Sequence, residues 1–170
     1  FINNFLVNYL CNDNTIVLDQ AISVANIENT IKYFNNSKVI VIDRDPRDTY
    51  IDLVNNNLLI GAELRIKDSS DKYIKWHKAM RDKLDIEVKN GDLSKIVLRL
   101  NYEELVYDYE QSVIKIIDFI GADLFHKDKF CHFDPRSNET KNNIGLWKKY
   151  RNSTVMNEIS RELKQYCIDN

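Results

Sequence analysis

The chain has 170 residues, of which 44% are hydrophobic and 29% are charged, and its formal net charge is −2. This length and composition predict one soluble globular domain with its own core, and they exclude a disordered tail. The small net charge excludes a general attraction to nucleic acid or to an anionic membrane, so any anion site needs a local group of donors. No apolar run approaches the roughly 20 residues that cross a bilayer.

The three cysteines, Cys11, Cys131 and Cys167, are an odd number without CxxC spacing. We therefore expect no disulfide framework, and a reducing cytoplasm is the simplest compartment. Cys131 lies near His126 and His132, but this spacing fits no common zinc pattern and lacks a fourth ligand. We expect no metal.

The first 42 residues predict a helix followed by a strand–helix–strand unit. Apolar residues recur at helical spacing over 1–10 and over 26–34, whereas 15–18 and 38–42 are β-rich runs. The second run is almost continuously β-branched, which is typical of a strand covered on both faces. Such units nearly always have a right-handed crossover between parallel strands.

The middle of the chain begins with a polar turn at 43–48. We expect a helix over 49–59, a loop over 61–70 and a long amphipathic helix over 71–88. The run at 95–100 predicts a third buried strand.

The last third predicts a helix over 110–120 that ends at Gly121, because glycine commonly adopts the left-handed conformation that closes a helix. Residues 122–143 show no clear period and are a candidate functional loop. Two helical stretches, 146–151 and 154–168, follow. We therefore predict a single α/β domain over 1–170, with a parallel sheet and helices on both faces.

Ligands of open parallel sheets bind beyond the carboxyl ends of the strands. The most informative such place is residues 39–50, Val-Ile-Val-Ile-Asp-Arg-Asp-Pro-Arg-Asp-Thr-Tyr. Here Arg44 and Arg47 leave a strand and enter a helix N-terminus, where backbone N–H groups and guanidinium groups suit a phosphate. The structural alternative is a turn capped by Asp48, in which the arginines pair with Asp43 and Asp45.

Three stretches together resemble the sulfotransferase family, which uses 3′-phosphoadenosine 5′-phosphosulfate as its sulfuryl donor. Residues 39–50 resemble the family's 3′-phosphate-binding segment, in which a strand leads into Arg-Asp-Pro-Arg-Asp and a helix. Residues 98–106, with the Asp-Phe-Ile-Gly at 118–121, resemble its third strand, following turn and helix end. Residues 142–150 resemble its late loop with a Gly-x-Trp-Lys core, which covers the 3′ side of the nucleotide. The resemblance implies a P-loop-NTPase-like sulfotransferase fold.

The resemblance also implies donor-binding residues. Arg44 matches the arginine that grips the 3′-phosphate, and the late loop and its neighbours complete the expected set: Arg47, Asp52, Lys141, Asn143, Gly145, Trp147 and Lys148. The chain departs from the family in two places. Asp52 stands where the family commonly has a serine that binds the same phosphate, and Thr140-Lys141-Asn142 replaces Arg-Lys-Gly. A carboxylate about 4 Å from a phosphate costs on the order of 4 kcal/mol per charge pair at an effective dielectric near 20.

The family's 5′-phosphosulfate loop has no counterpart here. The four glycines, at 61, 91, 121 and 145, do not follow an N-terminal strand, so we expect the natural protein to extend upstream. The reaction also requires a catalytic base that takes the proton of the acceptor hydroxyl. Asp19, at the end of the first predicted strand, is the best-placed carboxylate, with a helix cap as its alternative role.

The resemblance thus predicts a sulfotransferase that moves a sulfuryl group from 3′-phosphoadenosine 5′-phosphosulfate to a hydroxyl acceptor, with a saccharide as the suggested acceptor. The other hypothesis is a non-catalytic relative that binds a nucleotide or a protein. Asp52, Thr140 and Asn142 favour that second hypothesis.

Overall fold

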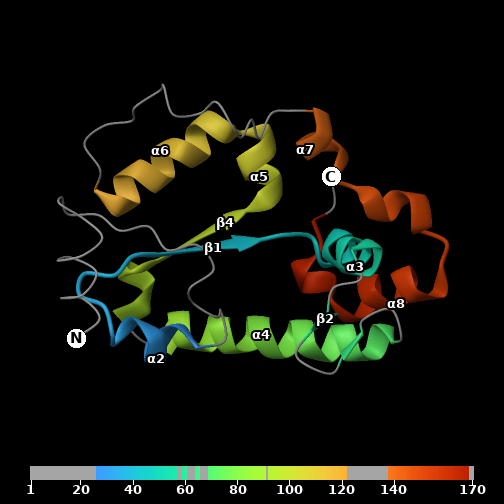
Figure 1. Cartoon of the computed structure of the whole chain (residues 1–170), viewed down its shortest axis with the longest axis horizontal. Helices are drawn as coiled ribbons and strands as arrows, with labels where there is room; N and C mark the ends of the chain where they lie inside the picture. The colour runs from blue at the N-terminus through green and yellow to red at the C-terminus, as the bar shows by residue number, and fades with distance from the viewer. Residues whose placement is uncertain are drawn as a thin grey trace. The chain divides into compact units, whose positions relative to one another are not determined.

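The computed structural model describes residues 26–56, 59–60, 64–65, 69–90, 92–121 and 138–168 (Figure 1). The chain divides into two compact units. The first comprises Phe1–Val39 and Ala79–Leu98, and the second comprises Ile40–Lys78 and Arg99–Asn170. The predicted helix at 1–10 and the predicted strand at 15–18 lie outside the described residues.

A two-stranded parallel sheet joins strand β1, Val39–Asp43, to strand β4, Val97–Asn101. Val39 N donates to Ile96 O at 2.7 Å at the beginning of this pairing. Both strands lie within two residues of their predicted positions. The parallel pair and the helices that separate its strands in the chain confirm the α/β class.

Strand β1 is buried on one face only. Val39 and Val41 are buried, whereas Ile40 and Ile42 are 37% and 42% exposed. The expectation of a strand covered on both faces is therefore wrong for this strand. Successive side chains of a strand point to opposite faces, and a run of uniformly apolar residues does not reveal which face is covered.

The first unit contains helix α2, Ile27–Ile31, the later turns of helix α4, Ser70–Asn90, and the 3₁₀ helix η2, Asp92–Lys95. Ile27 and Leu84 are completely buried. Glu28 N donates to Glu87 Oε2 at 3.3 Å, which links α2 to α4. Helix α4 confirms the long helix predicted from its apolar spacing.

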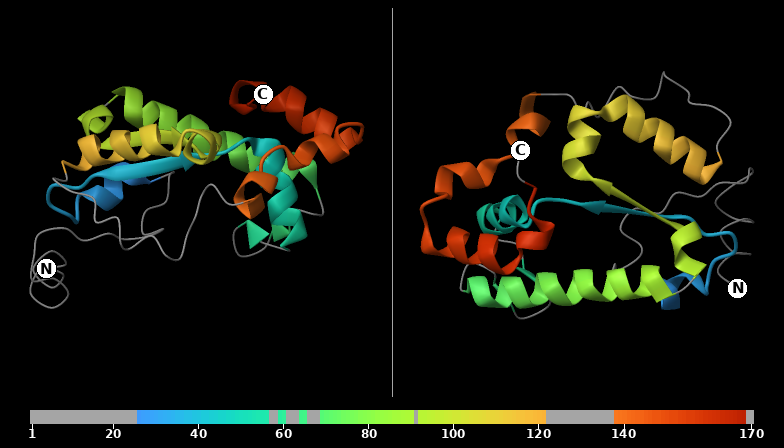
Figure 2. Two further views of the ribbon diagram at one scale, coloured as in Figure 1. Left: turned by 90° about the horizontal axis from the view of Figure 1, so that it is seen from above. Right: turned by 180° about the vertical axis from the view of Figure 1, so that it is seen from behind.

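The second unit has its core between helix α3, Pro46–Asn55, the first turns of α4, and helix α8, Thr154–Glu162. Figure 2 shows α3 beside the C-terminal helical segments in both views. The centre of the core is formed by four buried residues: Tyr73, Ile74, Ile159 and Leu163. Apolar side chains from two other segments, the first turns of α4 and the α8 region, therefore hold α3 in place.

Tyr73 connects this core to the beginning of α3. Its ring is completely buried and lies 5.2 Å from the ring of Tyr50, centroid to centroid. Its hydroxyl donates to Pro46 O at 2.6 Å. His77, 4% exposed, packs between Trp76 and Tyr166, as expected of a packed rather than a reactive histidine.

The region around β4 contains helices that the sequence only partly predicted. Helix α5, Tyr102–Tyr107, begins directly after β4, where we expected a turn. Helix α6, Tyr109–Ile120, ends as predicted at Gly121, whose φ is 71°. Strands β2, Leu59–Ile60, and β3, Leu64–Arg65, pair antiparallel in the stretch expected to be helix end and loop.

Helix α7, Asn138–Asn142, forms in the stretch that was expected to be loop. The later elements are shorter than predicted, beginning with the 3₁₀ helix η4, Leu146–Tyr150. Helix α8 begins after Ser153, whose side chain accepts from Met156 N, and the 3₁₀ helix η5, Lys164–Tyr166, follows it. None of the described helices is long and apolar enough to cross a membrane.

Replacing Tyr73 by Phe should lower the free energy of unfolding by about 1 kcal/mol, because the Pro46 carbonyl loses its buried donor while the ring stays in the core. Urea denaturation followed by circular dichroism measures this change. Tyr150→Phe is the matched control, because Tyr150 is 49% exposed. Equal midpoints for the two variants would show that the Tyr73 hydroxyl contributes nothing.

Candidate functional site

The beginning of α3 follows from its sequence. Pro46 occupies the first helical turn, where its missing N–H costs nothing. Asp45 is the capping residue, and its Oδ1 accepts from Arg47 N at 2.8 Å. We had placed the cap at Asp48, three residues too late, and the helix accordingly begins and ends earlier than predicted.

Asp45 and Arg47 form a buried ion pair. Arg47 Nη2 lies 2.7 Å from Asp45 Oδ2, Arg47 Nε lies 3.0 Å from Oδ1, and both side chains are at most 4% exposed. Arg47 also donates to Ile168 O at 3.1 Å and lies 3.7 Å from the centre of the Trp147 ring. The pairing of Arg47 with Asp45 is what the structural alternative, a capped turn with paired arginines, predicted. Arg47 could bind a ligand only if it lost these contacts.

Asp48 holds the late loop. Its carboxylate accepts from Gly145 N at 2.6 Å and from Trp147 N at 2.9 Å. Gly145 has φ of 76°, a conformation that glycine adopts without strain. Burial raises the pKa of Asp48, the two N–H donors oppose this, and the charge of Asp45 adds to it. The core of the predicted loop is thus anchored on α3.

Glu103 supports the same turn from the first turn of α5. It is 4% exposed, and its Oε1 accepts from Asp45 N at 3.1 Å. Glu103 therefore has a structural role, bonding to a backbone N–H. Its Oε2 is buried without a hydrogen-bond partner among the described residues. Burial raises the pKa of Glu103, and the charges of Asp45 and Asp48 raise it further.

A pocket of about 210 Å³ lies against these carboxylates. Asp45, Asp48 and Glu103 line it, together with residues of the late loop and the C-terminal segment, among them Gly145, Trp147, Lys148 and Ile168. With three carboxylates and a single lysine among its lining residues, this pocket does not attract an anion by charge.

Arg44, the predicted phosphate-binding residue, makes its contacts within the second unit. Its Nη1 lies 3.0 Å from Asp52 Oδ2, its Nη2 donates to Asn143 O at 2.7 Å, and its guanidinium carbon lies 5.0 Å from the centre of the Tyr102 ring. Its Nε is buried without a hydrogen-bond partner in the described part of the chain. Asp43, which the structural alternative paired with one of the two arginines, pairs instead with Arg99 at 2.8 Å.

The structure brings most of the predicted site residues into one region of the second unit. Arg44, Asp52 and Asn143 are in direct contact, and Arg47 lies on Trp147. Gly145, Trp147 and Lys148 line the pocket, and the Lys148 chain folds against Gly145. Lys141 is exposed on α7. Asp19, the proposed base, lies outside the described residues.

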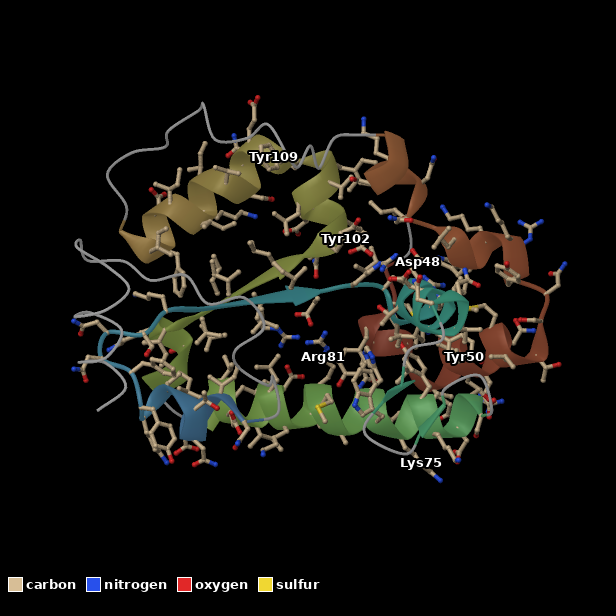
Figure 3. All side chains as sticks on the ribbon, in the orientation of Figure 1. Asp48, Tyr50, Lys75, Arg81, Tyr102 and Tyr109 are labelled. Atoms are coloured by element: carbon tan, nitrogen blue, oxygen red, sulfur yellow. The ribbon has the colours of Figure 1, made fainter. Side chains whose placement is uncertain are left out.

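Sequence reasoning gave too little weight to three residues. Asp45 and Asp48 were visible as the acidic members of the Arg-Asp-Pro-Arg-Asp run, and their spacing from the helix start could have shown a cap and a loop anchor. Tyr102 lies within the 98–106 resemblance, but no role was predicted for it. Figure 3 shows Asp48 on α3 and Tyr102 at the beginning of α5, where the two strands lead into helices.

A scan against protein-family models matched residues 6–127 to the sulfotransferase family. The chain belongs to the sulfotransferase family. No curated protein and no solved structure matched it. Membership indicates sulfuryl transfer in general, and the matched span contains β1, α3, β4 and α6 but not the late loop.

Replacing Asp45 by Ala should lower the free energy of unfolding by about 3–5 kcal/mol, because it leaves Arg47 buried without a counter-charge. The double variant Asp45→Ala/Arg47→Met should cost less than this single change. Urea denaturation measures both, with the exposed Asp71→Ala as control. A single variant no less stable than the double variant would contradict the buried-charge argument.

Stability should also depend on the protonation of Glu103. Its folded-state pKa is raised, so the folded protein holds this proton more tightly than the unfolded chain does. The contribution is present below the unfolded value of 4.5 and is lost as the pH rises through the higher folded value. Glu103→Gln should therefore gain stability relative to wild type as the pH rises above about 4.5. Parallel curves for the two proteins, measured by thermal unfolding at several pH values, would refute this.

Proposed function

We propose that this chain forms the nucleotide-phosphate side of an enzyme that transfers a sulfuryl group from 3′-phosphoadenosine 5′-phosphosulfate to a hydroxyl acceptor. The observation that carries the proposal is the position of Arg44. It lies directly after β1, and its guanidinium group lies over Tyr102, the residue directly after β4. Ligands of parallel sheets bind at this edge.

The family match supports the class of reaction, and the contacts of Arg44 support the place of the donor. Arg44 would bind a phosphate through its guanidinium edge, in the paired geometry that arginine forms with phosphate oxygens. Asn143 O already joins Arg44 to the late loop, so a nucleotide at Arg44 would lie next to Asn143. We propose that Lys141 and Lys148 supply further positive charge to the nucleotide from this loop.

In the proposed reaction, an acceptor oxygen attacks the sulfur atom and forms the new S–O bond. The S–O bond to the 5′-phosphate breaks, and adenosine 3′,5′-bisphosphate leaves with that electron pair. A base takes the proton of the acceptor hydroxyl, and we keep Asp19 as the candidate. A saccharide hydroxyl is the acceptor class to test first.

The proposed fold of the whole domain is a P-loop-NTPase-like sulfotransferase fold, in which residues 1–170 form one domain and an upstream strand and phosphate loop complete the donor site. The proposed compartment is the reducing cytoplasm, and the reaction itself needs no metal. Sequence upstream of residue 1 that contains a strand and a Ser/Gly/Thr loop with a Lys or Arg would support this arrangement.

A second candidate is a non-catalytic sulfotransferase-like domain that binds a nucleotide or a protein. The observation in its favour is the ion pair between Arg44 and Asp52, which engages the donor-binding arginine within the chain. Binding of adenosine 3′,5′-bisphosphate without turnover in the presence of an intact upstream phosphate loop would favour this candidate.

Adenosine 3′,5′-bisphosphate should raise the melting temperature, and Arg44→Ala should remove the effect. At about 100 times the dissociation constant, the ligand stabilises by roughly 2.7 kcal/mol, which in a chain of this size is about 5–10 °C. Arg161→Ala is the matched control, because this arginine is exposed on α8.

Each protein is compared with its own unliganded melting temperature, so any loss of stability from the substitution cancels. An equal shift in wild type and Arg44→Ala would place the nucleotide elsewhere. The absence of a shift in wild type would remove the support for donor binding.

A further inference from the structure

The two described partners of the Arg44 head group come from within the chain. Asp52 binds Nη1, and the Asn143 carbonyl binds Nη2. A phosphate that approached the edge holding Nη1 would meet the carboxylate of Asp52. Carboxylate and phosphate are recognised by the same guanidinium geometry, so the two compete for one set of donors.

The burial of the two side chains shows which partner can move. The Arg44 side chain is 18% exposed and rests on Tyr102, whereas the Asp52 side chain is 46% exposed. Asp52 lies near the end of α3, and Asn56 Nδ2 donates to its Oδ1 at 2.8 Å. A half-exposed carboxylate can turn into water without a large desolvation cost, because solvent takes over its hydrogen bonds. Arg44 would stay in place.

We propose that Asp52 is an internal competitor at Arg44 and sets the preference of the site for a ribose phosphate. This inference rests on the proposed nucleotide site. The incoming phosphate displaces the Asp52 carboxylate from Nη1, and the affinity is reduced mainly because the displaced carboxylate repels the phosphate. Asp52 thereby weakens the binding of a 3′-phosphorylated nucleotide but leaves a nucleotide without this phosphate nearly unaffected.

The charge of Asp52, and not its shape, carries this effect. Exposed ion pairs contribute little, because water and salt screen them. The larger effect comes from the repulsion between Asp52 and the phosphate, since a phosphate carries close to two negative charges at neutral pH. The Arg44 Nε is a further guanidinium donor, buried and without a partner among the described residues.

The test is isothermal titration of the full chain with adenosine 3′,5′-bisphosphate and with adenosine 5′-monophosphate. Asp52→Asn, which has nearly the same shape and no charge, should bind the bisphosphate about tenfold more tightly than wild type, a change of about 1.4 kcal/mol. Its affinity for the monophosphate should stay close to that of wild type. Asp52→Ser should behave like Asp52→Asn.

Two controls separate the charge at Arg44 from other effects. Asp52→Glu retains the charge and should show no gain. Asp71→Asn removes an exposed carboxylate on α4, paired with Lys75 at 2.8 Å, and should leave both affinities unchanged. Circular dichroism shows whether each variant is folded.

The outcomes distinguish the two proposals. If wild type binds the bisphosphate, Arg44→Ala loses it, and neither Asp52→Asn nor Asp52→Ser gains affinity, the competitor role of Asp52 is refuted and the nucleotide site stands. If the gain is the same for the bisphosphate and the monophosphate, Asp52 does not set the preference for the ribose phosphate. If neither the wild type nor any folded variant binds the bisphosphate, the proposed nucleotide site is refuted. The competitor role of Asp52 is then refuted with it.

Discussion

The carboxylate of Asp45 is the point on which the second unit depends. It accepts from Arg47 N, from the Arg47 side chain and from Ile168 N, the last at 2.9 Å. It therefore caps α3, neutralises a buried arginine and fixes the C-terminal segment with one functional group. A buried ion pair is tolerated only when further hydrogen bonds satisfy its remaining donors and acceptors. Here Ile168 provides one donor and one acceptor. Its N–H donates to Asp45, and its carbonyl accepts from Arg47.

The neighbouring carboxylates hold the surrounding segments by the same chemistry. Asp48 binds two N–H groups of the late loop, and Glu103 binds the N–H of Asp45. Burial raises the pKa values of Asp48 and Glu103, and the charges of the neighbouring carboxylates raise them further. The region positions loops by binding their backbone N–H groups. Arg44, at the edge of this cluster, pairs with Asp52.

Much of the fold could be predicted because its signals are local. The β-branched runs predicted β1 and β4, the apolar spacing predicted α4, and Gly121 predicted the end of α6. Helix α5 was missed because Tyr-Glu-Glu after a strand also suits a turn. The β2–β3 pair was missed because each strand has only two residues, too few to show a periodic pattern. Likewise, the resemblance identified Arg44 and the Gly-x-Trp-Lys loop, since both are short contiguous motifs.

The sequence by itself determined the α/β class, the order of the main elements and the presence of several opposite charges near the end of β1. Only the tertiary structure decided which of these charges pair. Asp48 and Gly145 lie 97 residues apart in the chain, and Arg44 and Asn143 lie 99 residues apart. Local propensity carries no information about such distances. Pairing follows from where the packed core of Tyr73, Ile159 and Leu163 places α3 against the C-terminal segments, and ionic contacts form between the groups that this packing brings within about 3 Å of each other.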